Sequence, residues 1–261
     1  MQQDQNILQI ENLTKFFGGL AAVSKCSLNI KKGSITGIIG PNGSGKTTLF
    51  NLIAGNLKST NGNVFFNNEQ ITNLPSYQLF AKGLLRTFQI AHEFSNLTVL
   101  ENLMMVPGNQ SGENLITALM KPKLVSKEEE VIKSKAMGVI EFLNLKHLAY
   151  ELAGNLSGGQ KKLLELGRTM MVDAKLVLLD EVGAGVNRTL LKDLGTAILR
   201  LNREKGYTFC MIEHDMDFIS RMCDPVIVMS EGSVLFEGTP NEVKKNEKVI
   251  ESYLGRANKF V

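Results

Sequence analysis

Residues 40–47 read Gly40-Pro41-Asn42-Gly43-Ser44-Gly45-Lys46-Thr47, and this stretch decides the fold of the chain. It matches the phosphate-binding loop, or P-loop, in which a glycine-rich turn runs directly into a lysine and a hydroxyl residue. Glycines let successive backbone N–H groups point inward as an anion nest, and the following helix adds its unpaired amides and the positive end of its dipole. The motif therefore predicts that a triphosphate binds here.

The neighbours of this loop have the structure that the motif needs. Residues 34–39 are a short run rich in β-branched side chains, which predicts a strand, and residues 48–54 predict a helix that ends at Gly55. In such an arrangement Lys46 serves the β- and γ-phosphates, and Thr47 offers its hydroxyl to Mg²⁺.

The composition is that of an ordinary globular protein. The chain has 261 residues, of which 43% are hydrophobic, and its net charge of +3 is too small to indicate nucleic acid as a partner. The three cysteines include no C-x-x-C pair, so neither a zinc site nor a disulfide framework is indicated. The N-terminus lacks the features of a secretion signal, and no apolar run approaches the ~20 residues that span a bilayer. If the protein works at a membrane, we expect another subunit to span it.

The order of patterns along the chain predicts a mixed α/β protein. Short strands are expected at 7–10 and 28–30, a hairpin near 61–66, and a helix that begins at Pro75. Residues 98–148 have a helical pattern, with one helix expected to begin at Ser126. Beyond Gly154 helices and strands alternate, which is typical of parallel βαβ units, and residues 225–236 predict a final hairpin.

A second motif narrows the chemistry. Residues 176–179 are a continuous apolar run that predicts a buried strand, and two carboxylates, Asp180 and Glu181, follow it directly. Asp180 is placed to hold Mg²⁺, directly or through water, and Glu181 is suited to accept a proton from an attacking water. Acidic pairs after strands often only cap the next helix, but the P-loop upstream favours the catalytic interpretation.

The third motif, Leu156-Ser157-Gly158-Gly159-Gln160, precedes a long helical pattern. A serine and two glycines at a helix start form a second anion-binding geometry, which one nucleotide in one chain does not need. The motif resembles the signature sequence of the ABC ATPases. In that family the signature of one subunit closes over the ATP bound to the P-loop of another, so the resemblance implies a dimer with composite sites.

The resemblance also implies roles for single residues. Gln89 matches the Q-loop glutamine, which touches Mg²⁺ or the attacking water, and His214 matches the switch histidine that contacts the γ-phosphate. Phe17 stands where the family carries an aromatic ring that stacks on adenine, with Phe16 as an adjacent alternative. Asn187 replaces the Asp that is common in the family's D-loop, which leaves the dimer contacts of that loop open.

The expected site follows from these motifs and from the resemblance. The Mg²⁺ ligands would be Thr47, Gln89 and Asp180, the catalytic residues Glu181, His214 and Gln89, and the residues acting on a partner's ATP Ser157, Gly158, Gly159 and Gln160. ATP would contact Phe17, Gly40, Pro41, Asn42, Gly43, Ser44, Gly45, Lys46, Thr47 and Thr48.

The implied fold is a P-loop NTPase of the ABC ATPase type: a RecA-like parallel-sheet core with an antiparallel β subdomain and a helical subdomain. We expect one domain over residues 7–255, with the core at about 7–90 and 160–255 and the helical subdomain at about 91–159. Residues 1–6 and 256–261 are expected to be frayed tails.

Within the family the chain is most similar to the first-type ATPase of branched-chain amino acid importers. The stretch 83–89, the D-loop variant at 184–187 and the tail 237–255 carry this resemblance. It implies a peripheral subunit at the cytoplasmic face of the inner membrane. Its partners would be a second ABC ATPase, identical or different, two membrane permeases and, indirectly, a substrate-binding protein. A urea or amide importer, a lipopolysaccharide-type exporter and an ATP-driven clamp protein are the alternatives.

Overall fold

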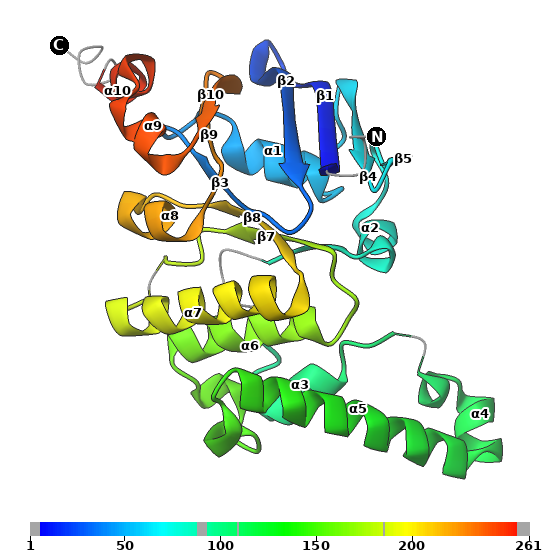
Figure 1. Cartoon of the computed structure of the whole chain (residues 1–261). Helices are drawn as coiled ribbons and strands as arrows, with labels where there is room; N and C mark the ends of the chain where they lie inside the picture. Colours follow the sequence, from blue (N-terminus) through cyan, green and yellow to red (C-terminus); the bar gives the residue numbers. More distant parts are fainter. Residues whose placement is uncertain (1–5, 88–92, 109, 185, 255–261) are drawn as a thin grey trace. The chain divides into compact units, whose positions relative to one another are not determined.

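The computed structural model describes residues 6–87, 93–108, 110–184 and 186–254. Residue contacts group the chain into two compact units. The first comprises residues 1–86, 175–184 and 199–261, and the second comprises residues 87–174 and 185–198. Figure 1 colours the elements by their order in the sequence.

The first unit contains a four-stranded antiparallel sheet of order β2-β1-β4-β5. Its strands are β1 (Asn6–Phe17), β2 (Leu20–Lys31), β4 (Asn61–Phe66) and β5 (Glu69–Gln70). Buried and exposed side chains alternate along the second half of β2, because successive residues of a strand point to opposite faces of the sheet. β1 and β2 are longer than the sequence predicts, since polar side chains occupy the outer face and hide much of each strand from a search for apolar runs.

The first unit also contains a six-stranded sheet of order β10-β9-β3-β8-β7-β6. The strands are β3 (Ile35–Ile39), β6 (Leu84–Arg86), β7 (Leu176–Asp180), β8 (Thr208–Ile212), β9 (Val226–Ser230) and β10 (Ser233–Gly238). β6, β7, β8, β3 and β9 pair in parallel, whereas β9 and β10 form an antiparallel hairpin. All residues of β3, β7 and β8 are buried, as expected for central strands of a parallel sheet. The carboxyl ends of β3, β7 and β8 therefore meet at one edge.

The helices of the first unit are α1 (Lys46–Ile53), α2 (Ser76–Lys82), α8 (Met216–Met222), α9 (Pro240–Lys245) and α10 (Glu247–Leu254). α1 follows β3 and the P-loop turn, as predicted, but it begins at Lys46, two residues earlier than the sequence predicts. The core of this unit includes residues of both sheets and the apolar face of α1, among them Leu49, Phe50 and Ile53.

The second unit is helical. It contains α3 (Val99–Met104), the 3₁₀ turns η2 (Ser111–Glu113), η3 (Lys146–Leu148) and η4 (Ala153–Asn155), α4 (Leu115–Met120), α5 (Pro122–Phe142), α6 (Gly158–Met170) and the first part of α7 (Arg188–Lys205). α5 contacts α3, α4 and α6. The expectation that a helix begins at Ser126 is wrong: α5 begins at Pro122, because the fixed φ of proline suits the first turn, where no amide donor is needed. Among the described residues, no helix has the length and apolar character that crossing a bilayer requires.

Two domain predictions remain predictions. Residue contacts group α6 with the second unit. The boundary predicted from the sequence, at residue 160, instead places most of α6 in the parallel-sheet core subdomain. Residues 1–5 and 255–261, which include most of the expected tails, lie outside the described residues.

Candidate functional site

The P-loop connects the end of β3 to the start of α1 in a conformation that needs glycine at two positions. Gly40 has φ 151° and Gly45 has φ 98°. A Cβ atom at Gly40 would lie 2.2 Å from the carbonyl oxygen of Met229, and one at Gly45 would lie 2.4 Å from that of Ala22. These glycines therefore let neighbouring backbone approach while the loop keeps its left-handed turns.

Lys46 is the first residue of α1, and its ammonium group folds back on the loop. Its Nζ donates to the carbonyl oxygens of Gly40, at 2.8 Å, and Pro41, at 3.1 Å. The side chain is buried, as is Ser44, whose amide donates to Pro41. The loop thus holds a buried positive charge beside the N-terminus of a helix, which is a geometry that attracts phosphate.

Asp180 is the last residue of β7, and its carboxylate is almost completely buried. Its partner is Arg86 at the end of β6, whose Nη2 donates to Oδ2 at 2.7 Å. Nη1 of Arg86 donates to Asn51 on α1. The arginine thus joins the P-loop helix, strand β6 and the acidic end of β7, and it neutralises a carboxylate whose isolation in the interior would be costly.

Glu181 and His214 follow the neighbouring strands β7 and β8 and meet at the edge of the sheet. The Nε2 atom of His214 lies 3.0 Å from Oε1 of Glu181. The backbone at Glu181 is left-handed, with φ 49°, and its amide donates to Ile212. Residues other than glycine adopt the left-handed conformation at a cost of about 1 kcal/mol or more. The surrounding backbone hydrogen bonds must therefore hold Glu181 in this conformation, and they fix the direction of its carboxylate.

Glu213 contributes to the same edge, and the sequence motifs do not predict this role. It is buried, and its carboxylate accepts hydrogen bonds from the amides of Gly183, at 2.7 Å, and His214, at 3.3 Å. Burial raises the pKa of this carboxyl above its ordinary value, although the two amides act in the opposite direction. Glu213 therefore ties the turn after Glu181 to the turn that carries His214.

The remaining predicted ATP contacts are less buried. Asn42, Gly43 and Thr47 are exposed along the loop, and Thr48 is partly covered. Phe17 ends β1 with about half of its surface exposed, and the Nζ of Lys15 lies 5.2 Å from the centre of its ring. Phe16 is equally exposed, so the choice between the two rings remains open. Gln89 lies outside the described residues.

The Ser157–Gln160 motif belongs to the second unit and begins α6. Ser157 is the N-cap: its hydroxyl accepts from the amide of Gln160, and the Gln160 side chain accepts from the amide of Ser157. Ser157 and Gly158 are exposed, whereas Gly159 is buried. A Cβ atom at Gly159 would lie 2.4 Å from Leu190, so this glycine is required by packing within the unit. Asn187 accepts from the amide of Leu190 near the start of α7.

The donors present suit Mg²⁺ held together with phosphate. Among the described residues, no three His, Cys, Asp or Glu side chains come together as a metal cage. Mg²⁺ is ordinarily bound by one or two protein oxygens, several waters and the phosphates of a substrate. The buried Asp180 carboxylate and the hydroxyl of Thr47 at the start of α1 provide such a set.

Parallel strands, a P-loop and paired carboxylates define a P-loop nucleotide-binding protein. A family model described as "ABC transporter" matches residues 23–184, and one described as "Branched-chain amino acid ATP-binding cassette transporter" matches residues 233–258. This chain therefore belongs to the ABC transporter family, as its sequence motifs predict.

Relatives that match over nearly their whole length agree with this family assignment. A probable branched-chain amino acid transport ATP-binding protein LivG of Archaeoglobus fulgidus is 45% identical over 95% of both chains. The BraF protein of Pseudomonas aeruginosa, named as a high-affinity branched-chain amino acid transport ATP-binding protein, is 36% identical over 96% of this chain and 98% of its own.

Solved structures support the same fold. A nucleotide-free ATP-binding cassette from an ABC transporter is 41% identical, with a TM-score of 0.81 over 95% of this chain and 98% of that one. A bacterial ABC transporter cassette solved as a dimer is 25% identical, with a TM-score of 0.72 over 89% of this chain and 98% of the other. The expected ABC ATPase fold is thus confirmed.

Proposed function

We propose that this chain is the ATP-hydrolysing subunit of an importer for branched-chain or other hydrophobic amino acids. The observation that carries the proposal is the meeting of Glu181 and His214 at the sheet edge that follows the buried Asp180. A protein that only binds nucleotide has no need for a carboxylate held in a left-handed backbone conformation against a histidine. The choice of cargo is supported by relatives that are named for branched-chain amino acid transport and that match over nearly their whole length.

The chain's own residues divide the work of hydrolysis. The P-loop amides and Lys46 bind the phosphates, and Phe17, or the adjacent Phe16, stacks on the base. Glu181 accepts the proton of the attacking water, and His214 holds Glu181 in place and contacts the γ-phosphate. Mg²⁺, held by Thr47, Asp180 and Gln89, would neutralise charge on the phosphates.

We propose that each site is completed by a second ATPase subunit. Ser157 and Gly158 are exposed at the start of α6, where they offer a hydroxyl and the positive end of the helix dipole to an anion outside their own unit. The similarity to a cassette solved as a dimer supports this arrangement. Asn187, in the D-loop position, would lie near the partner, although its side chain already caps the start of α7.

The proposed complex also contains two membrane permeases and a separate substrate-binding protein, and it works at the cytoplasmic face of the inner membrane. Affinity purification of the tagged chain from detergent-solubilised native membranes tests this composition. We expect two different permeases and an ATPase to co-purify, and deletion of the gene to abolish uptake of radiolabelled leucine. Recovery of a lipopolysaccharide-exporting permease, or of no membrane protein, would contradict the importer assignment.

A further inference from the structure

The short helix α4 presents its apolar side chains to solvent. Leu115, Ile116, Leu119 and Met120 are 86%, 74%, 82% and 73% exposed. At 100° per residue these four positions fall within about 140° of the helix circumference, so they form one face. The opposite positions, Thr117 and Ala118, are the partly covered ones. This pattern is the reverse of a normal surface helix, which turns its apolar face to the core.

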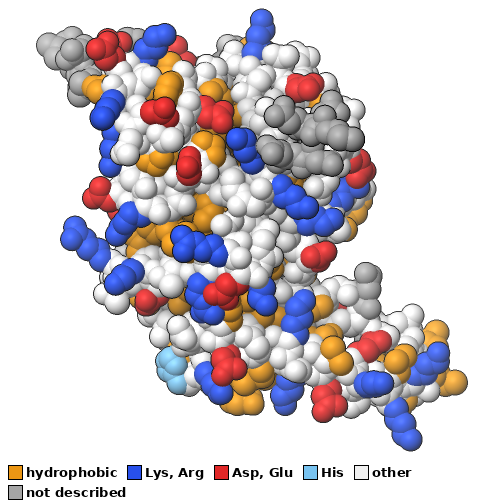
Figure 2. Space-filling view, viewed as in Figure 1, with side chains coloured by type: hydrophobic (Ala, Val, Ile, Leu, Met, Phe, Trp, Pro, Cys, Tyr) orange, Lys and Arg blue, Asp and Glu red, His pale blue; other side chains and the backbone are white. Residues whose placement is uncertain are grey.

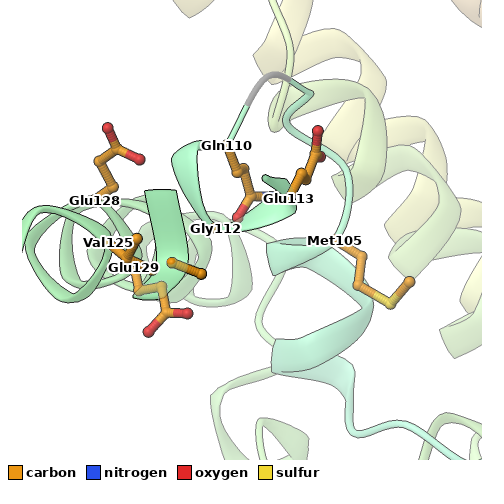
Figure 3. A pocket seen from close by; sticks show the side chains of 8 residues that line it. Met105, Gln110, Gly112, Glu113, Val125, Glu128 and Glu129 are labelled. Carbon is orange, nitrogen blue, oxygen red and sulfur yellow. The ribbon is translucent and has the colours of Figure 1, made fainter. Parts of the chain in front are cut away.

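Hydrogen bonds fix α4 in this orientation. The side chain of Asn114 caps α4 by accepting from the amides of Ile116 and Thr117. Just before it, the amide and hydroxyl of Ser111 both donate to Glu128 on α5, at 3.0 and 2.8 Å. A hollow beside α4 is lined by Ala118 of α4 and by residues of η2 and α5, including Gly112, Val125 and Glu128, and Figure 3 labels the residues of η2 and α5 that line it. Specific hydrogen bonds of the folded chain therefore hold the apolar face of α4 toward solvent.

Positive charge lies directly beside this face. Residues 114–127 contain three lysines, Lys121, Lys123 and Lys127, and no aspartate or glutamate, whereas Glu113 and residues 128–130, all glutamate, lie just outside this stretch. All three lysines are exposed. Figure 2 shows orange and blue side chains side by side at the end of the second unit where Figure 1 places α4. We call the four apolar residues of α4 and these three lysines the α4 patch.

We propose that the α4 patch contacts the surface of a membrane that contains acidic lipids. Aliphatic side chains would enter the boundary between headgroups and acyl chains, and the lysines would reach lipid phosphates. A protein partner is less favoured, because protein interfaces are depleted of lysine, of which the α4 patch contains three. The inference rests on the proposed function only in that the transporter brings the chain to a membrane.

Co-sedimentation of the purified full-length chain with vesicles tests the proposal. One set of vesicles contains phosphatidylglycerol and phosphatidylethanolamine, and the other contains phosphatidylcholine alone. We expect binding to the first set that weakens with added salt. The double variant Ile116→Ser/Leu119→Ser should bind the first set at least about tenfold more weakly, because two large apolar side chains are no longer transferred from water into the lipid.

Replacing the lysines separates the electrostatic contribution to vesicle binding from the contribution of the apolar side chains. Each change of Lys121, Lys123 or Lys127 to Gln should weaken binding to the anionic vesicles about fivefold and leave binding to phosphatidylcholine unchanged. Val131→Ser is the matched control: Val131 is an exposed aliphatic residue on α5 outside the α4 patch, and its change should have no effect. Circular dichroism and ATP binding confirm that each variant is folded.

Two outcomes would overturn the proposal. One is that the full-length chain binds neither kind of vesicle. The other is that the double variant binds as well as the parent, or loses only the association with solubilised permeases, which would make the patch a protein contact. Vesicle binding by a chain that supports no ATP turnover even in the assembled transporter would contradict the proposed function but support the role of the α4 patch, so the two failures are distinguishable.

Discussion

At the scale of single residues, the site depends on charges held in fixed positions before any ligand arrives. Lys46 is bound to loop carbonyls, Asp180 to Arg86, and Glu181 to His214. Each of these pairings keeps a polar side chain satisfied where isolation would be costly. Binding of nucleotide then exchanges existing partners for phosphate, so little ordering of side chains is needed.

The first prediction concerns Glu181. Glu181→Gln should slow ATP hydrolysis by about 10² to 10⁴ and leave ATP affinity nearly unchanged, because the amide keeps the shape of the side chain but cannot accept the proton. Phosphate release and nucleotide binding are the two measurements. Glu204→Gln, which alters an exposed carboxylate paired with Arg200, is the control. Turnover near the parent rate in the Glu181 variant would refute its role as general base.

The second prediction concerns the pH dependence of stability. Burial raises the folded-state pKa of Glu213 above its ordinary value of 4.5, while Glu181 nearby raises it and His214 lowers it. The stability that this raised pKa contributes is fully present below 4.5 and is lost as the pH rises through the folded-state value. Glu213→Gln keeps an acceptor for the Gly183 amide without titrating.

The parent should therefore lose stability relative to Glu213→Gln as the pH rises above about 5. Urea unfolding at a series of pH values measures this difference. Parallel pH profiles for the two proteins would show that the burial of this carboxylate has no energetic consequence.

The residues that the sequence reveals are those whose role depends on local order. The P-loop, the Asp180-Glu181 pair and the Ser157 cap each lie within a few adjacent residues. Arg86 and Glu213 could not be predicted in the same way. Arg86 contacts a carboxylate 94 residues away, and Glu213 an amide 30 residues away, so both contacts exist only once β6, β7 and β8 are adjacent.

At the scale of elements, Asn102 shows how a polar side chain shapes the start of the helical unit. It lies on α3 with no exposed surface. Its Nδ2 is within hydrogen-bond distance of the carbonyls of Phe94, Leu97 and Thr98, and its Oδ1 accepts from the amide of Phe94. The turn before α3 is therefore organised by one side chain.

The third prediction follows from this network. Asn102→Ala should lower the free energy of unfolding by about 3 kcal/mol, since it leaves buried backbone groups without partners. Urea denaturation followed by circular dichroism measures the loss. Lys146→Ala, which removes an exposed ion pair with Glu141, should change stability by less than about 1 kcal/mol. Equal effects of the two changes would show that the Asn102 network contributes little.

The helical unit was also the least predictable part of the fold. Helical periodicity indicates that residues 98–148 are helical but does not fix their boundaries. Pro122 suggests an interruption, yet it occupies the first turn of α5. The outward apolar face of α4 could not be predicted at all, because an apolar run in a sequence is normally assigned to the core.

At the scale of the whole molecule, the two units carry different parts of the chemistry. The first unit contains the P-loop, Asp180, Glu181 and His214, and the second contains the Ser157 motif. We expect the Ser157 motif to serve the ATP of another subunit. Steady-state ATP turnover of complementary variants tests it most directly.

Lys46→Ala removes the phosphate-binding lysine and keeps the Ser157 motif, whereas Ser157→Arg blocks that motif and keeps the P-loop. Each variant alone should be inactive in the assembled transporter, and Ser157→Arg should still bind ATP as a monomer. Combining the two variants in one dimer should restore one working site, with turnover at about a quarter of the parent rate in an equal mixture of identical-chain dimers. Parent-like turnover by Ser157→Arg alone would contradict the account.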